Sequence, residues 1–267
     1  MTELLRANIL ADLAYYRRSR LLLAFMLLFL LLTGLGSLPP LFANSGIQSF
    51  NALKEIFSEL NGFLLVLCAC LGLFIISSHL RSRSLKMVFT KPCPPAVWLL
   101  SAFLSAVIVS LLLNFVVLAS TTILSLIWHV PVRPGLVFLS AETFVVSVGL
   151  IAYLMLLATL VHPAVAAICT LVFNADLFYG AQLWTDAVIR SGNKDLWLRA
   201  LKGLFHWLYL IFPMLHPFDK KTEGIHVSLR VMHGEWKYLL YSFGYALTLS
   251  GFCYCVALFA LQKKKHI

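Results

Sequence analysis

The amino-acid sequence predicts an all-α protein with six membrane-spanning helices, preceded by a short helix at the membrane surface. Hydrophobic residues make up 61% of the chain and charged residues 12%, and the mean hydropathy is +0.90, which is too apolar for a soluble domain. Long uncharged runs alternate with segments rich in proline or basic residues, as in polytopic helical proteins. Lys and Arg number 21 against 11 Asp and Glu. In a membrane protein this excess indicates cytoplasmic loops and membrane lipid rather than nucleic acid as the partner.

Residues 1–20 predict a helix that lies at the cytoplasmic surface before the chain enters the membrane. Apolar side chains recur on one helical face, at Leu5, Ile9, Leu13 and Tyr16. Asp12 projects into the same face and makes the apolar stripe imperfect. A frayed basic tail is the alternative interpretation.

The first span is expected over 21–38, an uncharged run closed by Pro39 and Pro40. A cleaved signal peptide competes with this interpretation, but no clear small-x-small cleavage site follows closely. Residues 41–60 are expected to form an outer loop with a short interfacial helix, because apolar residues recur there at helical spacing between charged ones.

Five further apolar runs predict the remaining spans. Their expected bounds are 62–80, 96–128, 136–161, 163–184 and 238–261. A continuous helix over 96–128 would be about 50 Å long, against about 30 Å for the hydrocarbon core. That helix must therefore tilt and protrude, or break near Ser120 to Thr122.

A long outer region, 185–236, is expected between the fifth and sixth spans. Its apolar part, 196–215, is too short to cross the bilayer unless it includes Arg199 and Lys202. A seventh crossing would also place the C-terminal lysines outside. We therefore expect a re-entrant or interfacial helix over 196–215.

The charge distribution places both termini in the cytoplasm. With the N-terminus inside, eleven of the Lys and Arg residues fall in inner segments. Of the outer ones, eight lie between Arg190 and Lys237, in one long region where the positive-inside rule is weakest. Tryptophans support the same layout, because four of them fall at predicted span ends: Trp98, Trp128, Trp184 and Trp236.

Residues 81–95 combine basic and apolar side chains between two spans. The segment contains Arg81, Arg83, Ser84, Leu85, Lys86, Met87, Val88 and Phe89, followed by a proline cluster. The basic residues would hold it on the cytoplasmic side. The apolar residues belong to no span, so they need a lipid surface or a protein partner.

This segment resembles the first cytoplasmic loop of ABC-2-type transporter permeases, the membrane subunits of one class of ATP-driven exporters. The likeness is carried by Ser84-Leu85, by Lys91-Pro92 at the turn, and by Val97 to Leu100 where the next span begins. His79 stands where many members of the family carry Glu, and Pro95 stands where an Arg is common.

The resemblance implies a single ABC-2-type transmembrane domain over 1–267 in the bacterial cytoplasmic (inner) membrane. It implies that 1–20 is an elbow helix and that 81–95 is a coupling helix. Two permeases, as a homodimer or with a paralogue, would face each other above two ABC ATPase subunits that bind ATP and Mg. The chain itself has no Gly-x4-Gly-Lys-Ser/Thr phosphate loop, and no catalytic, cofactor or metal site is expected on it.

Four polar residues within the spans are candidates for a translocation path: Asn114, Glu142, Asn174 and Asp176. Glu142 and Asp176 are the only carboxylates inside the predicted spans, and ionisable groups at membrane depth often mark function. Both lie toward the outer ends of their spans, where they could reach water or pair with Arg133. They leave open an alternative class, an ion-coupled carrier or channel that needs no ATPase.

Two further groups of side chains are weaker candidates, one for a metal site and one for close helix packing. The outer region is rich in side chains that suit copper, at His206, Met214, His216, His226, Met232 and His233, but their spacing does not repeat. Small residues share one face of the sixth span, at Gly244, Thr248, Gly251 and Cys255, where another helix could approach closely.

Overall fold

The computed structural model describes residues 2–18, 27, 31, 34, 46–80, 94–172, 175–190, 196–214 and 219–264, and every regular element among them is a helix. The helices are α1 Thr2–Arg18, α3 Gly46–Leu80, α5 Pro95–Ile127, α6 Pro134–Leu160, α7 Pro163–Val172, α8 Ala175–Arg190, α9 Leu196–Ile211, α10 Asp219–Ser228 and α11 Trp236–Lys264. Within these residues, α3, α5, α6 and α11 are long and apolar enough to cross a membrane. The all-helical fold and the membrane-protein class are therefore confirmed.

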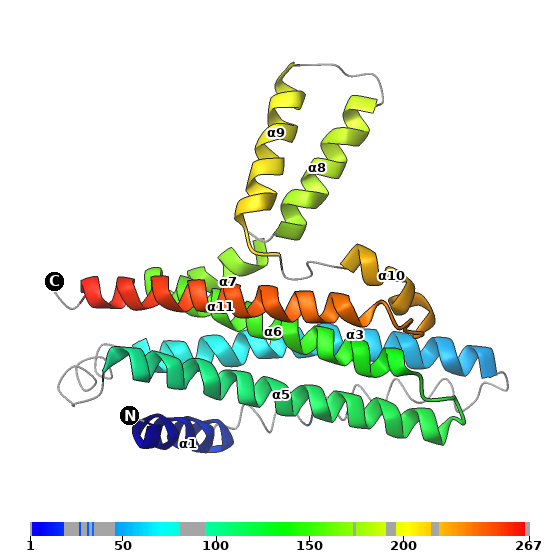
Figure 1. Cartoon of the computed structure of the whole chain (residues 1–267), viewed down its shortest axis with the longest axis horizontal. Helices are drawn as coiled ribbons and strands as arrows, with labels where there is room; N and C mark the ends of the chain where they lie inside the picture. Colours follow the sequence, from blue (N-terminus) through cyan, green and yellow to red (C-terminus); the bar gives the residue numbers. More distant parts are fainter. Residues whose placement is uncertain are drawn as a thin grey trace.

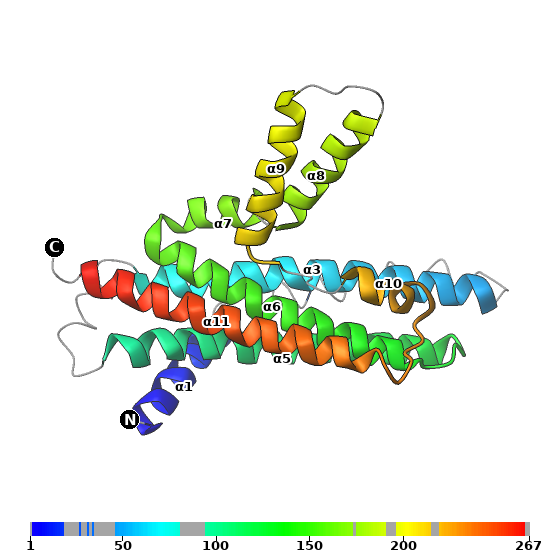
Figure 2. The same ribbon diagram turned by 45° about the horizontal axis from the view of Figure 1, so that its top comes forward.

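The four long helices run side by side along the long axis of the molecule (Figures 1 and 2), with α6 in contact with the other three. The hydrophobic core has two clusters. One joins the first half of α3 to the end of α5, the start of α6 and α10. The other joins α1 to the second half of α3, the start of α5 and the end of α11. We call these the α10 end and the α1 end of the bundle.

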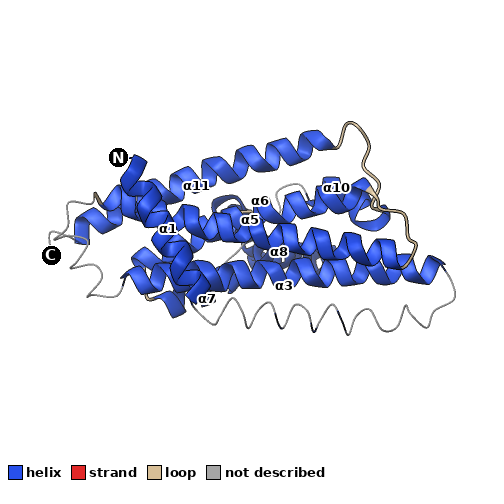
Figure 3. Cartoon of the chain, turned by 90° about the horizontal axis from the view of Figure 1, so that it is seen from below, coloured by secondary structure: helices blue, strands red, loops and turns tan. Residues whose placement is uncertain are grey.

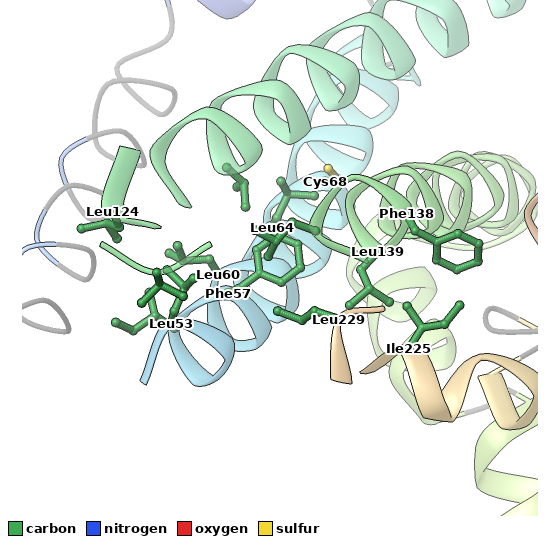
Figure 4. Close-up of a cluster of buried hydrophobic side chains, with 14 of the residues drawn as sticks. Leu53, Phe57, Leu60, Leu64, Cys68, Leu124, Phe138, Leu139, Ile225 and Leu229 are labelled. Carbon is green, nitrogen blue, oxygen red and sulfur yellow. The ribbon is translucent and has the colours of Figure 1, made fainter. Parts of the chain in front are cut away.

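The expected outer loop over 41–60 is wrong from Gly46 onward, because α3 begins there. Instead of an interfacial helix followed by a separate span from residue 62, one helix continues from Gly46 to Leu80. Its buried stripe explains why: Leu53, Phe57, Leu60 and Leu64 follow one another at helical spacing across the expected boundary, and all are at most 2% exposed. Figure 4 shows them with Phe138 and Leu139 of α6 and Ile225 and Leu229 at α10.

Helix α5 is continuous, which resolves the alternative that the sequence left open. The hydroxyls of Ser120, Thr121 and Thr122 donate to the carbonyls of Val117 and Leu118 one turn earlier, at 2.7–3.0 Å. These polar groups are thus satisfied without a break in the helix. The helix is longer than the bilayer core, so it must tilt or protrude.

The expected fifth span, 163–184, is wrong as a single helix. Residues 163–172 form α7 along the bundle, whereas α8 leaves it at a steep angle and continues to Arg190, into the expected outer region (Figures 1 and 2). α8 and α9 lie against each other as a hairpin. An ion pair of 2.5 Å between Lys202 and Asp186 joins the two helices, as does a ring contact of 5.7 Å between Tyr179 and Tyr209. Large apolar side chains of both helices nevertheless remain exposed, among them Trp184 on α8 and Trp207 on α9.

Helix α1 packs on α5 and reaches α3 with Tyr16, through the face that the sequence predicts (Figure 3). The Tyr16 hydroxyl donates to the Leu71 carbonyl at 3.1 Å, and the Ser105 hydroxyl donates to Asp12 at 3.4 Å. Asp12, which interrupts the apolar stripe, thus has a polar partner on α5. Burial, reinforced by the neighbouring Asp12, raises the pKa of Tyr16, so the phenol stays a neutral donor at physiological pH.

A tight backbone contact fixes α10 on the start of α6. The Gly135 N–H donates to the Leu229 carbonyl at 3.0 Å, and a Cβ added at Gly135 would lie 2.4 Å from that oxygen. Gly135→Ala should therefore force the two backbones apart and lower the stability of the folded protein by about 2 kcal/mol. Thermal unfolding of the detergent-purified chain measures this loss.

Gly149→Ala is the matched control on the same helix, because the added Cβ would meet only a Leu249 methyl at an ordinary 3.6 Å. We expect Gly149→Ala to melt close to the wild type. Equal melting temperatures for Gly135→Ala and the wild type would contradict the close contact.

Candidate functional site

The carboxylate of Glu142 is held between α6 and α10. Its side chain is 7% exposed, one oxygen lies 3.3 Å from the imidazole Nε2 of His226, and the other accepts a hydrogen bond of 3.3 Å from the Thr222 hydroxyl. Thr222 and His226 are four residues apart on α10 and therefore share one helical face. We call these three residues the Glu142 cluster.

The local sequence of α10 explains this placement. Ile225 and Leu229 follow the same face, and both are buried in the core at the α10 end. Arg133 fixes the end of α10 from outside the cluster, because its guanidinium donates to the Ser228 carbonyl at 2.5 Å and lies 4.1 Å from the centre of the Phe50 ring. The expectation that Glu142 reaches water or pairs with Arg133 is thus wrong.

The Glu142 cluster can hold α10 against α6, and we call this role a latch. A buried carboxylate is costly in an apolar bundle unless polar partners compensate for the lost water. The hydroxyl and the imidazole supply those partners, and both come from a segment some 80 residues away. Glu142 therefore ties α10 to α6.

Asn114 lies in a second polar group within the bundle, apart from Glu142. Its amide donates to the Ser110 carbonyl at 3.0 Å, while its buried Oδ1 has no hydrogen-bond partner among the described residues. The Ser110 hydroxyl pairs with Ser147 at 2.5 Å and accepts from the Cys68 thiol at 3.3 Å. Three helices, α3, α5 and α6, are thereby joined through small polar side chains.

Sequence reasoning missed these partners. Cys68, Ser110 and Ser147 are small polar side chains within apolar runs, and nothing in their spacing predicts that they meet. A serine in an apolar run is a weak sign of a hydrogen bond between helices, because its hydroxyl usually bonds to a carbonyl of its own helix. Only the packing of three helices brings them together.

The other predicted site residues cannot be placed in a site. Asn174 and the coupling residues of 81–93 lie outside the described residues: Arg81, Arg83, Ser84, Leu85, Lys86, Met87, Val88 and Phe89. Asp176 lies in the first turn of α8, and only its backbone is described. Across the described part of the chain, no three His, Cys, Asp or Glu side chains form a metal-binding group.

Comparison of the chain with protein-family models, with curated proteins and with solved structures finds no match in any of the three. Its function has to be inferred from its residues and their geometry.

If the Glu142 cluster is a latch, removing the carboxylate should loosen α10. We expect Glu142→Ala to speed amide hydrogen exchange within 219–229 about tenfold, which corresponds to about 1.4 kcal/mol of lost local stability. Glu142→Gln keeps an acceptor for Thr222 and should have a smaller effect. Exchange is measured by mass spectrometry on the purified chain.

Glu223→Ala is the control, because Glu223 is an exposed carboxylate on the same helix. Its exchange should match the wild type. Unchanged exchange in Glu142→Ala would rule out the latch.

Proposed function

We propose that this chain is the permease subunit of an ATP-driven exporter of the ABC-2 class, in the bacterial cytoplasmic membrane. The observation that carries the proposal is the arrangement at the α1 end. There the amphipathic α1 docks beside the end of α3 and the start of α5, the two helices that flank the basic segment 81–93. An elbow helix next to a coupling segment is the layout that the family resemblance implies.

The directions of the described helices support six spans. In the proposed layout the apolar run 21–38 supplies the first crossing, which fits α1 at one end of the bundle and the start of α3 at the other. We propose the other crossing between Leu160, at the α1 end, and Trp236, at the α10 end (Figure 1). With the candidate spans α3, α5, α6 and α11, the proposal counts six crossings.

In the proposed complex, two separate ATPase subunits bind ATP and Mg and dock beneath 81–95. Closure of the ATPases pushes this segment and tilts the spans that it joins. A second permease packs against the first, and the small-residue face of α11 is available for it, because Gly244, Thr248, Gly251 and Cys255 are all exposed in the single chain. Asn114 and Glu142 are buried within one copy, so they line a path only if the helices around them separate.

A second class of function, an ion-coupled carrier or channel, draws support from the Glu142 cluster. A buried carboxylate beside a half-exposed imidazole is a group that can exchange a proton with water. The Oδ1 of Asn114, which no described residue satisfies, adds a polar site within α5 at membrane depth. This class requires no ATPase, so recovery of a partner separates the two.

The six-span layout predicts opposite accessibility for the two ends of the bundle. In intact cells, a single cysteine at Glu223 should react with an impermeant maleimide, and one at Gln262 should react only after permeabilisation, because both positions are exposed but lie at opposite ends. Labelling is measured on a background without the native cysteines. Reaction of the Gln262 position in intact cells would mean an odd number of spans.

The coupling assignment predicts which residues hold the ATPase. If 81–95 docks in a groove, Leu85→Asp or Val88→Asp should release the ATPase while the permease still inserts, since buried apolar anchors contribute on the order of 2 kcal/mol or more. Arg83→Ala should weaken association less and make it more sensitive to salt. Co-purification at two salt concentrations measures both effects.

The rival interpretation is that the segment lies on lipid, with its basic residues at the headgroups. In that case, the aspartate variants would recover as much ATPase as the wild type. Such an outcome would remove the coupling helix and the main support for an ABC permease.

A further inference from the structure

A pocket opens between α3, α6 and the end of α10, beside the Glu142 cluster. Its volume is about 420 Å³, which is within the size range of sites for small ligands. Its walls include Phe57 and Leu65 of α3, Leu139 of α6 and Leu229 after α10. Figure 4 shows Phe57, Leu139 and Leu229 converging from these three elements.

The pocket is polar at one end and apolar at the other. Lys54 lies one helical turn before Phe57, nearer to the start of α3. Leu65 lies eleven residues after Lys54, which is about 16 Å along the helix. The candidate span of α3 begins at Ser49, so Lys54 lies near the headgroup layer and Leu65 lies at the depth of the hydrocarbon chains. This gradient matches the orientation of a bilayer lipid.

The charge of the pocket favours an anion. Among the described residues that line it, Lys54 and His226 are the only ionisable side chains. His226 is already beside the carboxylate of Glu142. Lys54 is half-buried and forms no ion pair with any described residue, so its charge remains available.

Asn61 adds a hydrogen-bond acceptor that no described residue satisfies. It lies between the charged and apolar parts of the wall, and its buried Oδ1 accepts no hydrogen bond from the described residues. An unmatched buried acceptor lowers stability, and a donor group of a ligand can satisfy it. The Oδ1 can accept from a hydroxyl, so it suits a hydroxylated headgroup.

We propose that this pocket binds an anionic phospholipid from the surrounding leaflet. Lys54 and Asn61 contact the phosphate and headgroup hydroxyls, and an acyl chain follows Phe57, Leu65 and Leu139. The site does not require contact with an ATPase, because it lies at the opposite end of α3 from Leu80, where the 81–93 segment is attached. α10 covers one side of it, so the bound lipid touches the helix that Glu142 holds in place.

Gly62 provides a direct way to fill the pocket. It lines the cavity, and a Cβ added there would meet no atom within 4 Å. Gly62→Leu should therefore occupy the ligand space without disturbing the helices. Gly203→Leu is the matched control, because Gly203 on α9 also has nothing within 4 Å and does not line the pocket.

The test uses the full chain in phosphatidylcholine vesicles with a trace of phosphatidylglycerol that carries a photoreactive diazirine on one acyl chain. After illumination and digestion, label should map to 57–65 or 139–143. Gly62→Leu should remove most of this label. Lys54→Gln should reduce it about fivefold, as expected for the loss of one ion pair. Gly203→Leu and Lys237→Gln, which removes a basic residue from the start of α11, should label like the wild type.

Competition identifies the ligand chemistry. Unlabelled phosphatidylglycerol should displace the probe, whereas added phosphatidylcholine or inorganic phosphate should not. Equal displacement by phosphatidylcholine would overturn the anionic preference, and displacement by inorganic phosphate would overturn the lipid assignment. Equal labelling of Gly62→Leu and Gly203→Leu would overturn the site itself.

Discussion

The structure depends on the burial of α6 among α3, α5 and α11. This helix is the most buried of the four candidate spans, so its side chains face protein on nearly every side. Its first half supplies Leu139 and Glu142 to the α10 end, and its second half supplies Met155 and Ala158 to the α1 end. In a bilayer, where lipid is as apolar as the helices, such close packing is a main source of stability. The other spans are positioned relative to one another because each packs on α6.

Polar groups within this bundle follow one rule: each is matched by a group from another helix or from its own preceding turn. Asp12 accepts from Ser105, and Glu142 accepts from Thr222. The Ser110 and Ser147 hydroxyls pair across α5 and α6. The exceptions among the described residues are Asn61 Oδ1, Asn114 Oδ1, Trp128 Nε1 and Ser250 Oγ, which are buried without a hydrogen-bond partner. Asn61 borders the cavity of about 420 Å³ between α3, α6 and α10, so a ligand has space beside it.

Hydropathy predicted the long helices well, because an uncharged run of span length has few alternatives in a folded chain. The expected spans 96–128, 136–161 and 238–261 agree within a few residues with α5, α6 and α11. The start of α3 was missed, since Lys54, Glu55 and Glu59 lower the local hydropathy although they leave the buried stripe intact. The partners of Asp12 and Glu142 could not be predicted, because each pair is more than 75 residues apart in sequence. The latch and the lipid pocket arise only when α10 folds back on α6.

Helix α3 connects the features that matter for function at both ends of the molecule. It runs without interruption over 35 residues, or about 52 Å. Near its start, Lys54 and Asn61 line the pocket, and near its end, the Leu71 carbonyl binds Tyr16 of α1. Residue 80, where α3 ends, is joined directly to the basic segment 81–93. A displacement imposed on that segment therefore acts on a stiff rod, and the pocket at the far end has to move with it or change shape. In the proposed permease, a lipid bound there would be sensitive to the state of the ATPases without contacting them.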